Sequence, residues 1–65
     1  MVTVNGESMA WYEGMTIQDI LEERKFTFRM LAVWVNDIPI PRSDFKGFKV
    51  PDQATVQVVH MISGG

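Results

Sequence analysis

No cysteine occurs among the 65 residues of this chain, and this limits what the chain can fold into. A disulfide framework and a thiolate metal site, the usual supports of very small folds, are both excluded. A chain of this size buries only about 60% of the surface that its unfolded form exposes, so its core is thin. Compaction must come from Val, Ile, Leu, Phe and Trp. The hydrophobic content of 46%, with 22% charged residues, is typical of a globular domain.

The charge balance is mildly acidic, with eight Asp and Glu residues against six Lys and Arg. This balance argues against nucleic acid as a partner, because phosphate binding needs clustered cations. The longest apolar run, residues 30–35, is far too short to span a bilayer. The amino end lacks the charged-then-apolar pattern of a secretory signal. We therefore expect a cytoplasmic protein with no membrane partner.

The amino-terminal residues predict a β-hairpin. Residues 1–4 alternate as a strand does, and Asn5 and Gly6 follow them. This pair is the strongest short signal for a two-residue turn, because both residues tolerate a positive φ. A second strand over roughly residues 8–12 is expected to pair back antiparallel.

A short helix is predicted between Thr16 and Lys25. Thr16 is a favourable N-cap, and Asp19 places negative charge in the first turn. Three apolar residues fall on one face at helical spacing: Ile17, Ile20 and Leu21. Three cations near the end are interpreted as C-terminal helix charges, with a site for an anionic ligand as the alternative: Arg24, Lys25 and Arg29.

The second half of the chain predicts further strands. Residues 31–35 read as a strand that is closed by a turn at residues 36–37. Residues 38–41 contain two prolines, which lack the N–H that a central strand needs, so we expect this segment at a sheet edge or in a loop. The last strand is expected over residues 55–62.

This order of elements indicates an α+β fold, a mixed four- to five-stranded sheet with one main helix packed on one face. If the last strand pairs parallel beside the first, the chain forms a ubiquitin-like β-grasp. Residues 1–62 are then the folded domain, and residues 63–65 a flexible C-terminal Gly-Gly tail. Three methionines are expected to fill gaps in the core: Met9, Met15 and Met30.

The chain ends in Gly64 and Gly65 after a single spacer, Ser63. A segment without Cβ atoms can be drawn extended into a narrow slot, which leaves its terminal carboxyl unobstructed. The Gly65 carboxyl is therefore the candidate reactive group. No catalytic residue is expected elsewhere, and none is expected to bind a metal, because the lone His60 has neither a cysteine nor a second histidine to act with.

Five segments, in this order and spacing, resemble the ThiS/MoaD family of sulfur carriers, and most closely its thiamine-biosynthesis branch, ThiS. They are VNGE (4–7), GMTIQDIL (14–21), AVWVN (32–36), IPR (40–42) and ISGG (62–65). The similarity covers nearly the full length, and it implies the β-grasp fold already favoured by the order of elements.

The resemblance also implies a chemistry. A ubiquitin-activating-type (ThiF-like) adenylyltransferase would use ATP to adenylate Gly65. A sulfur donor such as a cysteine desulfurase would then convert it to a thiocarboxylate, for use by a ThiG-like thiazole synthase. The carrier is in that case a protein cosubstrate, not an enzyme, and binds no cofactor. Alternatives are a carrier for molybdopterin or another metabolite, a ubiquitin-like protein modifier and a non-catalytic interaction module.

Docking of such partners needs a surface as well as a tail. If Val56 and Val58 face the helix, strand alternation places four other residues on the open face of the sheet. Exposed contiguous apolar surface on a small protein commonly marks a partner site, and Trp is a frequent anchor. The predicted partner-binding residues are Ala32, Trp34, Val59 and Met61.

Overall fold

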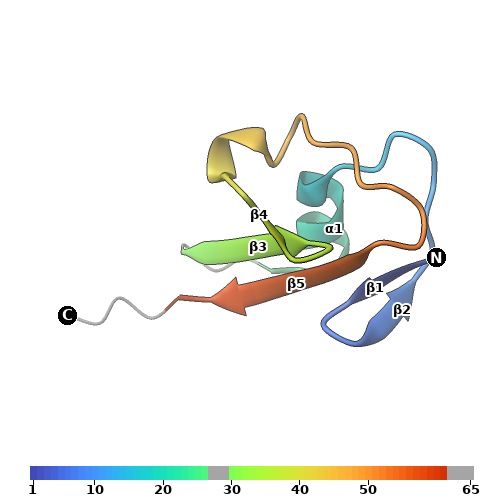
Figure 1. Cartoon of the computed structure of the whole chain (residues 1–65), viewed down its shortest axis with the longest axis horizontal. Coiled ribbons are helices and arrows are strands. Elements are labelled where there is room, and N and C mark those ends of the chain that lie inside the picture. The colour runs from blue at the N-terminus through green and yellow to red at the C-terminus, as the bar shows by residue number, and fades with distance from the viewer. Residues whose placement is uncertain (27–29, 62–65) are drawn as a thin grey trace.

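The computed structural model describes residues 1–26 and 30–61, and within these ranges five strands form one mixed sheet with an α-helix across one face (Figure 1). The strand order is β2-β1-β5-β3-β4; β1 and β5 pair in parallel, and the other neighbours are antiparallel. This arrangement confirms the predicted α+β, β-grasp fold. The elements are β1 (Val2–Val4), β2 (Glu7–Met9), α1 (Ile17–Glu23), β3 (Leu31–Val35), β4 (Ile38–Ile40), the 3-10 helix η1 (Arg42–Asp44) and β5 (Thr55–His60).

Both hairpins close through two-residue turns in which every turn residue has a positive φ. In the β1–β2 turn, φ is 50° at Asn5 and 85° at Gly6. In the β3–β4 turn, φ is 51° at Asn36 and 67° at Asp37. Turns of this kind match the twist of the flanking strands, which explains why Asn, Asp and Gly occupy them. Both predicted turns are confirmed.

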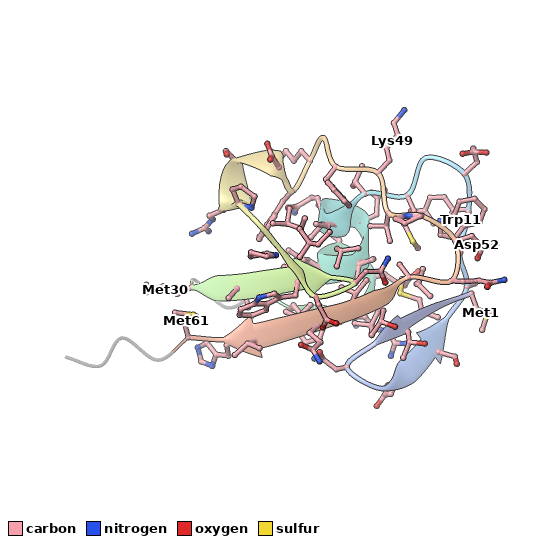
Figure 2. The ribbon with its side chains drawn as sticks, viewed as in Figure 1. Met1, Trp11, Met30, Lys49, Asp52 and Met61 are labelled. Atoms are coloured by element: carbon pink, nitrogen blue, oxygen red, sulfur yellow. The ribbon has the colours of Figure 1, made fainter. Side chains whose placement is uncertain are left out.

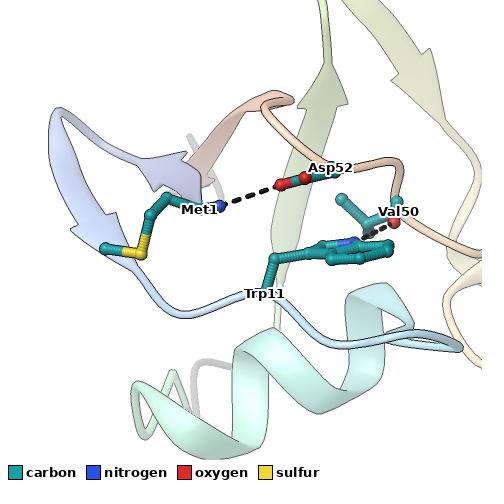
Figure 3. A network of polar contacts seen from close by, with 4 residues as sticks. All are labelled: Met1, Trp11, Val50 and Asp52. Carbon is teal, nitrogen blue, oxygen red and sulfur yellow. Dashed lines mark hydrogen bonds and ion pairs between the residues drawn. The ribbon is translucent and has the colours of Figure 1, made fainter.

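The second strand starts earlier than predicted and is shorter. The tight turn makes Glu7 the first paired residue, and the antiparallel pairing is as predicted. β2 ends at Met9, so the prediction is right for residues 8–9 and wrong for residues 10–12. Beyond β2 the chain leaves the sheet and is held by Trp11. The indole Nε1 of Trp11 donates a 2.7 Å hydrogen bond to the carbonyl oxygen of Val50 (Figure 3).

Helix α1 begins and ends with specific hydrogen bonds. Thr16 Oγ1 accepts from the backbone N–H of Asp19 at 3.2 Å, and Asp19 Oδ2 accepts from the backbone N–H of Thr16 at 2.9 Å. This capping box confirms the predicted N-cap. At the other end Lys25 has φ 58°, and the N–H of Phe26 donates to the carbonyl oxygen of Leu21 at 2.8 Å. These features define a Schellman motif, in which glycine is the usual residue at the position of Lys25.

Two aspartates give the fold an acid-sensitive component. The hydrogen bond from the Thr16 N–H lowers the pKa of Asp19, and the bond from the Met1 ammonium, 2.8 Å away, lowers the pKa of Asp52 (Figure 3). A lowered pKa in the folded state stabilises the fold above the ordinary Asp pKa of about 3.9. That stabilisation is lost as the pH falls through the lower, folded-state pKa. We expect the melting temperature to drop below about pH 4.

Thermal melts of the wild type and of the Asp19→Asn/Asp52→Asn double variant across this range check the prediction. The melting temperature of the variant should be lower than that of the wild type at neutral pH, and it should fall less on acidification. Parallel melting curves of the two proteins against pH would contradict it.

The core lies between α1 and the sheet, and it explains which predicted apolar residues are buried. The largest fully buried side chains are Met15, Ile17, Ile20, Val2, Val33 and Val56. Met9 and Met15 are buried as predicted. The prediction for Met30 is wrong, because its side chain is 45% exposed. Met30 precedes β3 at the end of the sheet, next to Met61, where it does not reach the core (Figure 2).

Both edges of the sheet are protected. On β4, Pro39 is paired opposite Trp34, which confirms that the proline-containing segment forms an edge strand. On β2, the carbonyl oxygen of Ser8 accepts a 3.0 Å hydrogen bond from Arg24, which also forms a 2.8 Å ion pair with Glu7. A proline or a covering side chain on an edge strand disfavours pairing with another chain.

Candidate functional site

The strand that leads to the carboxyl terminus is held on both sides. β5 lies between β1 and β3, and its pairing with β3 continues to Leu31–His60. One residue further, the N–H of Met61 donates to the carbonyl oxygen of Met30 at 3.0 Å. The predicted tail residues Ser63, Gly64 and Gly65, and the domain boundary at residue 62, lie outside the described residues. The last described residue, Met61, is therefore tied to the sheet.

Asn5 holds β5 on the β1 side. Its side-chain Oδ1 accepts from the N–H of Val58 at 2.8 Å, and its Nδ2 donates to the carbonyl oxygen of Val58 at 3.1 Å. Its backbone N–H donates to Val56 O at 3.0 Å. β1 ends at Val4, so the side-chain amide of Asn5 makes the hydrogen bonds to Val58 that the backbone of a longer β1 would make. Sequence reasoning assigned Asn5 only to the turn, and nothing in the sequence links it to a residue 53 positions away.

Asn36 makes a similar but smaller contact at the start of β5. Its Oδ1 accepts from the N–H of Thr55 at 2.9 Å, and its backbone N–H donates to Thr55 O at 2.8 Å. Like Asn5, it is the first residue of a two-residue turn and has nearly the same φ. Asn36 is thus a natural control for Asn5, because alanine is strained equally at both positions.

Asn5→Ala should destabilise the fold more than Asn36→Ala. The first change removes two partly buried hydrogen bonds and leaves the N–H and the carbonyl of Val58 without their side-chain partner, at about 1–3 kcal/mol, whereas the second removes one exposed hydrogen bond. Urea unfolding measures the difference, and hydrogen exchange should accelerate at the Val58 amide in the Asn5 variant. Equal losses of stability would show that the side-chain contacts to Val58 contribute little.

The four predicted partner-binding residues lie on neighbouring strands, β3 and β5, or directly after β5. Ala32 pairs with Val59 and Trp34 pairs with Gln57, and directly paired residues of antiparallel strands point to the same face. Val33, Val35, Val56 and Val58 are buried on the helix side, so Ala32, Trp34 and Val59 lie on the open side. Ala32 and Trp34 are half-buried, whereas Val59 and Met61 are 46% and 47% exposed.

Met30 extends this surface, and sequence reasoning missed it. It is hydrogen-bonded to Met61, and the two labelled side chains lie at the same end of the sheet (Figure 2). We call Met30, Ala32, Trp34, Val59 and Met61 the apolar patch. On β1 and β2 the open face is polar, because Thr3 is paired with Ser8 on one side and with Thr55 on the other. The exposed members of the patch, Met30, Val59 and Met61, lie at the end of the sheet where β5 leads to the tail. Trp34 lies further along β3, between Gln57 and Pro39.

Three further observations describe the chemistry of the residues in the structure. Within residues 1–26 and 30–61, no three His, Asp or Glu side chains are close enough together to bind a metal ion. His60 is the exposed last residue of β5. No helix in these two ranges has both the length and the apolar character needed to cross a membrane. What these residues offer is an apolar patch beside β5, the strand that leads toward residue 65.

A mixed five-stranded sheet, with its first and last strands parallel and a helix on one face, defines the class of ubiquitin-like β-grasp proteins. The sequence model of the ThiS family matches residues 2–65, so the chain belongs to the ThiS family. The crystal structure of the thiamine biosynthesis protein (ThiS) from Geobacter metallireducens is similar in fold, with a TM-score of 0.80 and 24% identity over 98% of this chain and 97% of that one. A comparison with curated protein sequences found no match.

Proposed function

We propose that this chain is a sulfur carrier whose Gly65 carboxylate is adenylated and then converted to a thiocarboxylate. The observation that carries the proposal is the extent of the family match, which runs through the tail to residue 65 itself. Further support comes from the structure, where the strand before the tail is anchored by Asn5 on one side and β3 on the other. An anchored strand followed by two glycines suits a terminal carboxylate that other proteins must bind.

The chemistry follows from the carboxylate. An α-carboxyl group has a pKa of about 3.3–3.7, so it is ionised at neutral pH and repels nucleophiles. Attack of a carboxylate oxygen on the α-phosphorus of ATP forms an acyl adenylate and releases pyrophosphate. Sulfide then attacks the acyl carbon and AMP leaves, which gives the thiocarboxylate. If the attacking sulfur is a protein persulfide, a second thiol must cleave the S–S bond to release the product.

All catalytic groups in this scheme belong to other proteins. The carrier is a cosubstrate for a ThiF-like adenylating enzyme that uses ATP, and it receives sulfur from a donor such as a cysteine desulfurase. The acceptor is a ThiG-like thiazole synthase, an assignment supported by membership of the ThiS family and by the similarity to a thiamine biosynthesis protein from Geobacter metallireducens. The apolar patch is the docking surface, and the cytoplasm is the expected compartment.

Intact-mass measurement tests the proposal. The chain is incubated with ATP, a ThiF-like enzyme, a cysteine desulfurase and cysteine, and a sample without ATP is the control. The expected product has one terminal oxygen replaced by sulfur, and only when ATP is present. An unchanged mass would contradict the sulfur-carrier function. Attachment of the chain to lysines of other proteins would instead identify a protein modifier.

A further inference from the structure

A cavity of about 430 Å³ opens on the helix side of the sheet, between α1, the start of β3 and η1. Two hydrogen bonds fix its walls. The N–H of Gln18 donates to the carbonyl oxygen of Phe45 at 2.9 Å, which ties α1 to η1. The hydrogen bond of the Schellman motif, from the N–H of Phe26 to the carbonyl oxygen of Leu21, places Phe26 against the cavity. The volume lies within the range of about 300–1,000 Å³ that is usual for ligand-binding pockets.

The floor and the rim of this cavity differ in chemistry. The floor is apolar and largely aromatic, formed by Leu21 and Phe45, which are buried, and by Phe26 and Leu31, which are partly buried. The rim carries two exposed cations, Lys25 and Arg42. A site with an apolar floor and a cationic rim suits a ligand that has an apolar body and a negative charge.

One carboxylate also faces this rim. This carboxylate belongs to Glu22, which accepts a 3.1 Å hydrogen bond from Gln18. Because the rim has two cations and one carboxylate, its net charge is positive, although the protein as a whole is acidic. The ion pairs found among residues 1–26 and 30–61 are Met1–Asp52 and Glu7–Arg24, so neither rim cation is used in one of them. Lys25 and Arg42 are therefore available to a carboxylate brought by a partner.

The cavity opens at the same end of the sheet from which the tail starts. Leu31, on the floor, is paired with His60 in β5, and the next residue along β5 is Met61. The exposed members of the apolar patch lie at this end on the opposite face. A protein that holds the tail is therefore close to both surfaces.

We propose that this cavity is a docking site for a peptide segment of a partner protein, which inserts one large apolar side chain and places an adjacent carboxylate between Lys25 and Arg42. That the partner is a protein which binds the tail rests on the proposed function; the binding of such a segment to the cavity does not. A second carboxylate in the docking segment is disfavoured, because Asp19 and Glu23 on the outer face of α1 would repel it.

An NMR titration of the ¹⁵N-labelled full chain tests this inference. The probes are the blocked dipeptide N-acetyl-Phe-Asp-amide and its neutral counterpart N-acetyl-Phe-Asn-amide. We expect amide shifts at Leu21, Phe26, Leu31 and Phe45, and about threefold tighter binding of the acidic probe, the size of effect that exposed ion pairs give.

Two charge variants make the test specific. Lys25→Glu/Arg42→Glu should remove the preference for the acidic probe. Lys46→Glu/Lys49→Glu changes the net charge equally at exposed positions outside the cavity and should keep that preference. Absence of shifts at the floor residues, equal binding of the two probes, or equal loss in both variants would each overturn the inference. The charging of Gly65 is read out separately by mass, so a failure of either proposal leaves the other measurement unaffected.

Discussion

Gly65→Ala should abolish activation of the chain without unfolding it. The new methyl group is adjacent to the acyl carbon, where it crowds the adenylated end and narrows the extended path through the partner's channel. ATP–pyrophosphate exchange catalysed by a ThiF-like enzyme measures activation, and we expect it to fall to background. The melting temperature should not change, because β5 ends at His60, five residues before the substitution.

Ser63→Ala is the matched control for this change. It also alters one tail residue, but it keeps the glycine pair and the terminal carboxylate, so exchange should continue at close to the wild-type rate. A second comparison removes Gly64 and Gly65 entirely. Normal exchange by the Gly65→Ala chain would show that activation does not require glycine at position 65. Normal exchange by the truncated chain would show that the terminal carboxylate of residue 65 is not the reactive group.

Trp34→Ala should weaken partner binding much more than it lowers stability. Trp34 is half-buried on the open face and is not among the partly buried residues that pack against the core. A tryptophan at the centre of an interface commonly contributes about 2 kcal/mol or more, so we expect about a 30-fold or greater loss of affinity for the adenylating enzyme. Calorimetric titration measures the affinity, and urea unfolding should show a loss below about 1 kcal/mol.

Ile20→Val is the complementary control. Ile20 is fully buried on the sheet-facing side of α1, and loss of one buried methylene typically costs about 0.5–1.5 kcal/mol. This variant should lose stability and keep the wild-type affinity for the partner. If Trp34→Ala instead behaves like Ile20→Val, with lower stability and unchanged affinity, Trp34 is a structural residue and the apolar patch is not the docking surface.

Much of the fold could be predicted because its signals are local. The turn residues at 5–6 and 36–37, the Thr16 capping box and the two-residue period of β3 and β5 act within a few neighbouring positions. The predicted strand over residues 8–12 was too long for a related reason. Beyond Met9 the chain is bonded outside the sheet, where the Trp11–Val50 hydrogen bond joins residues 39 positions apart.

The candidate site also has features that the sequence predicted and features that only the tertiary structure revealed. The glycine pair is a covalent feature, so the sequence by itself was enough to propose the Gly65 carboxylate as the reactive group, and strand alternation predicted which side chains share the open face. Only the tertiary structure decided that Met30 joins the patch, that Asn5 holds β5 at Val58, and that Lys25 and Arg42 border one cavity. These contacts depend on strand register and on how the helix packs against the sheet. Both are set by the whole core, because the distant residues that meet there carry no local signal of one another.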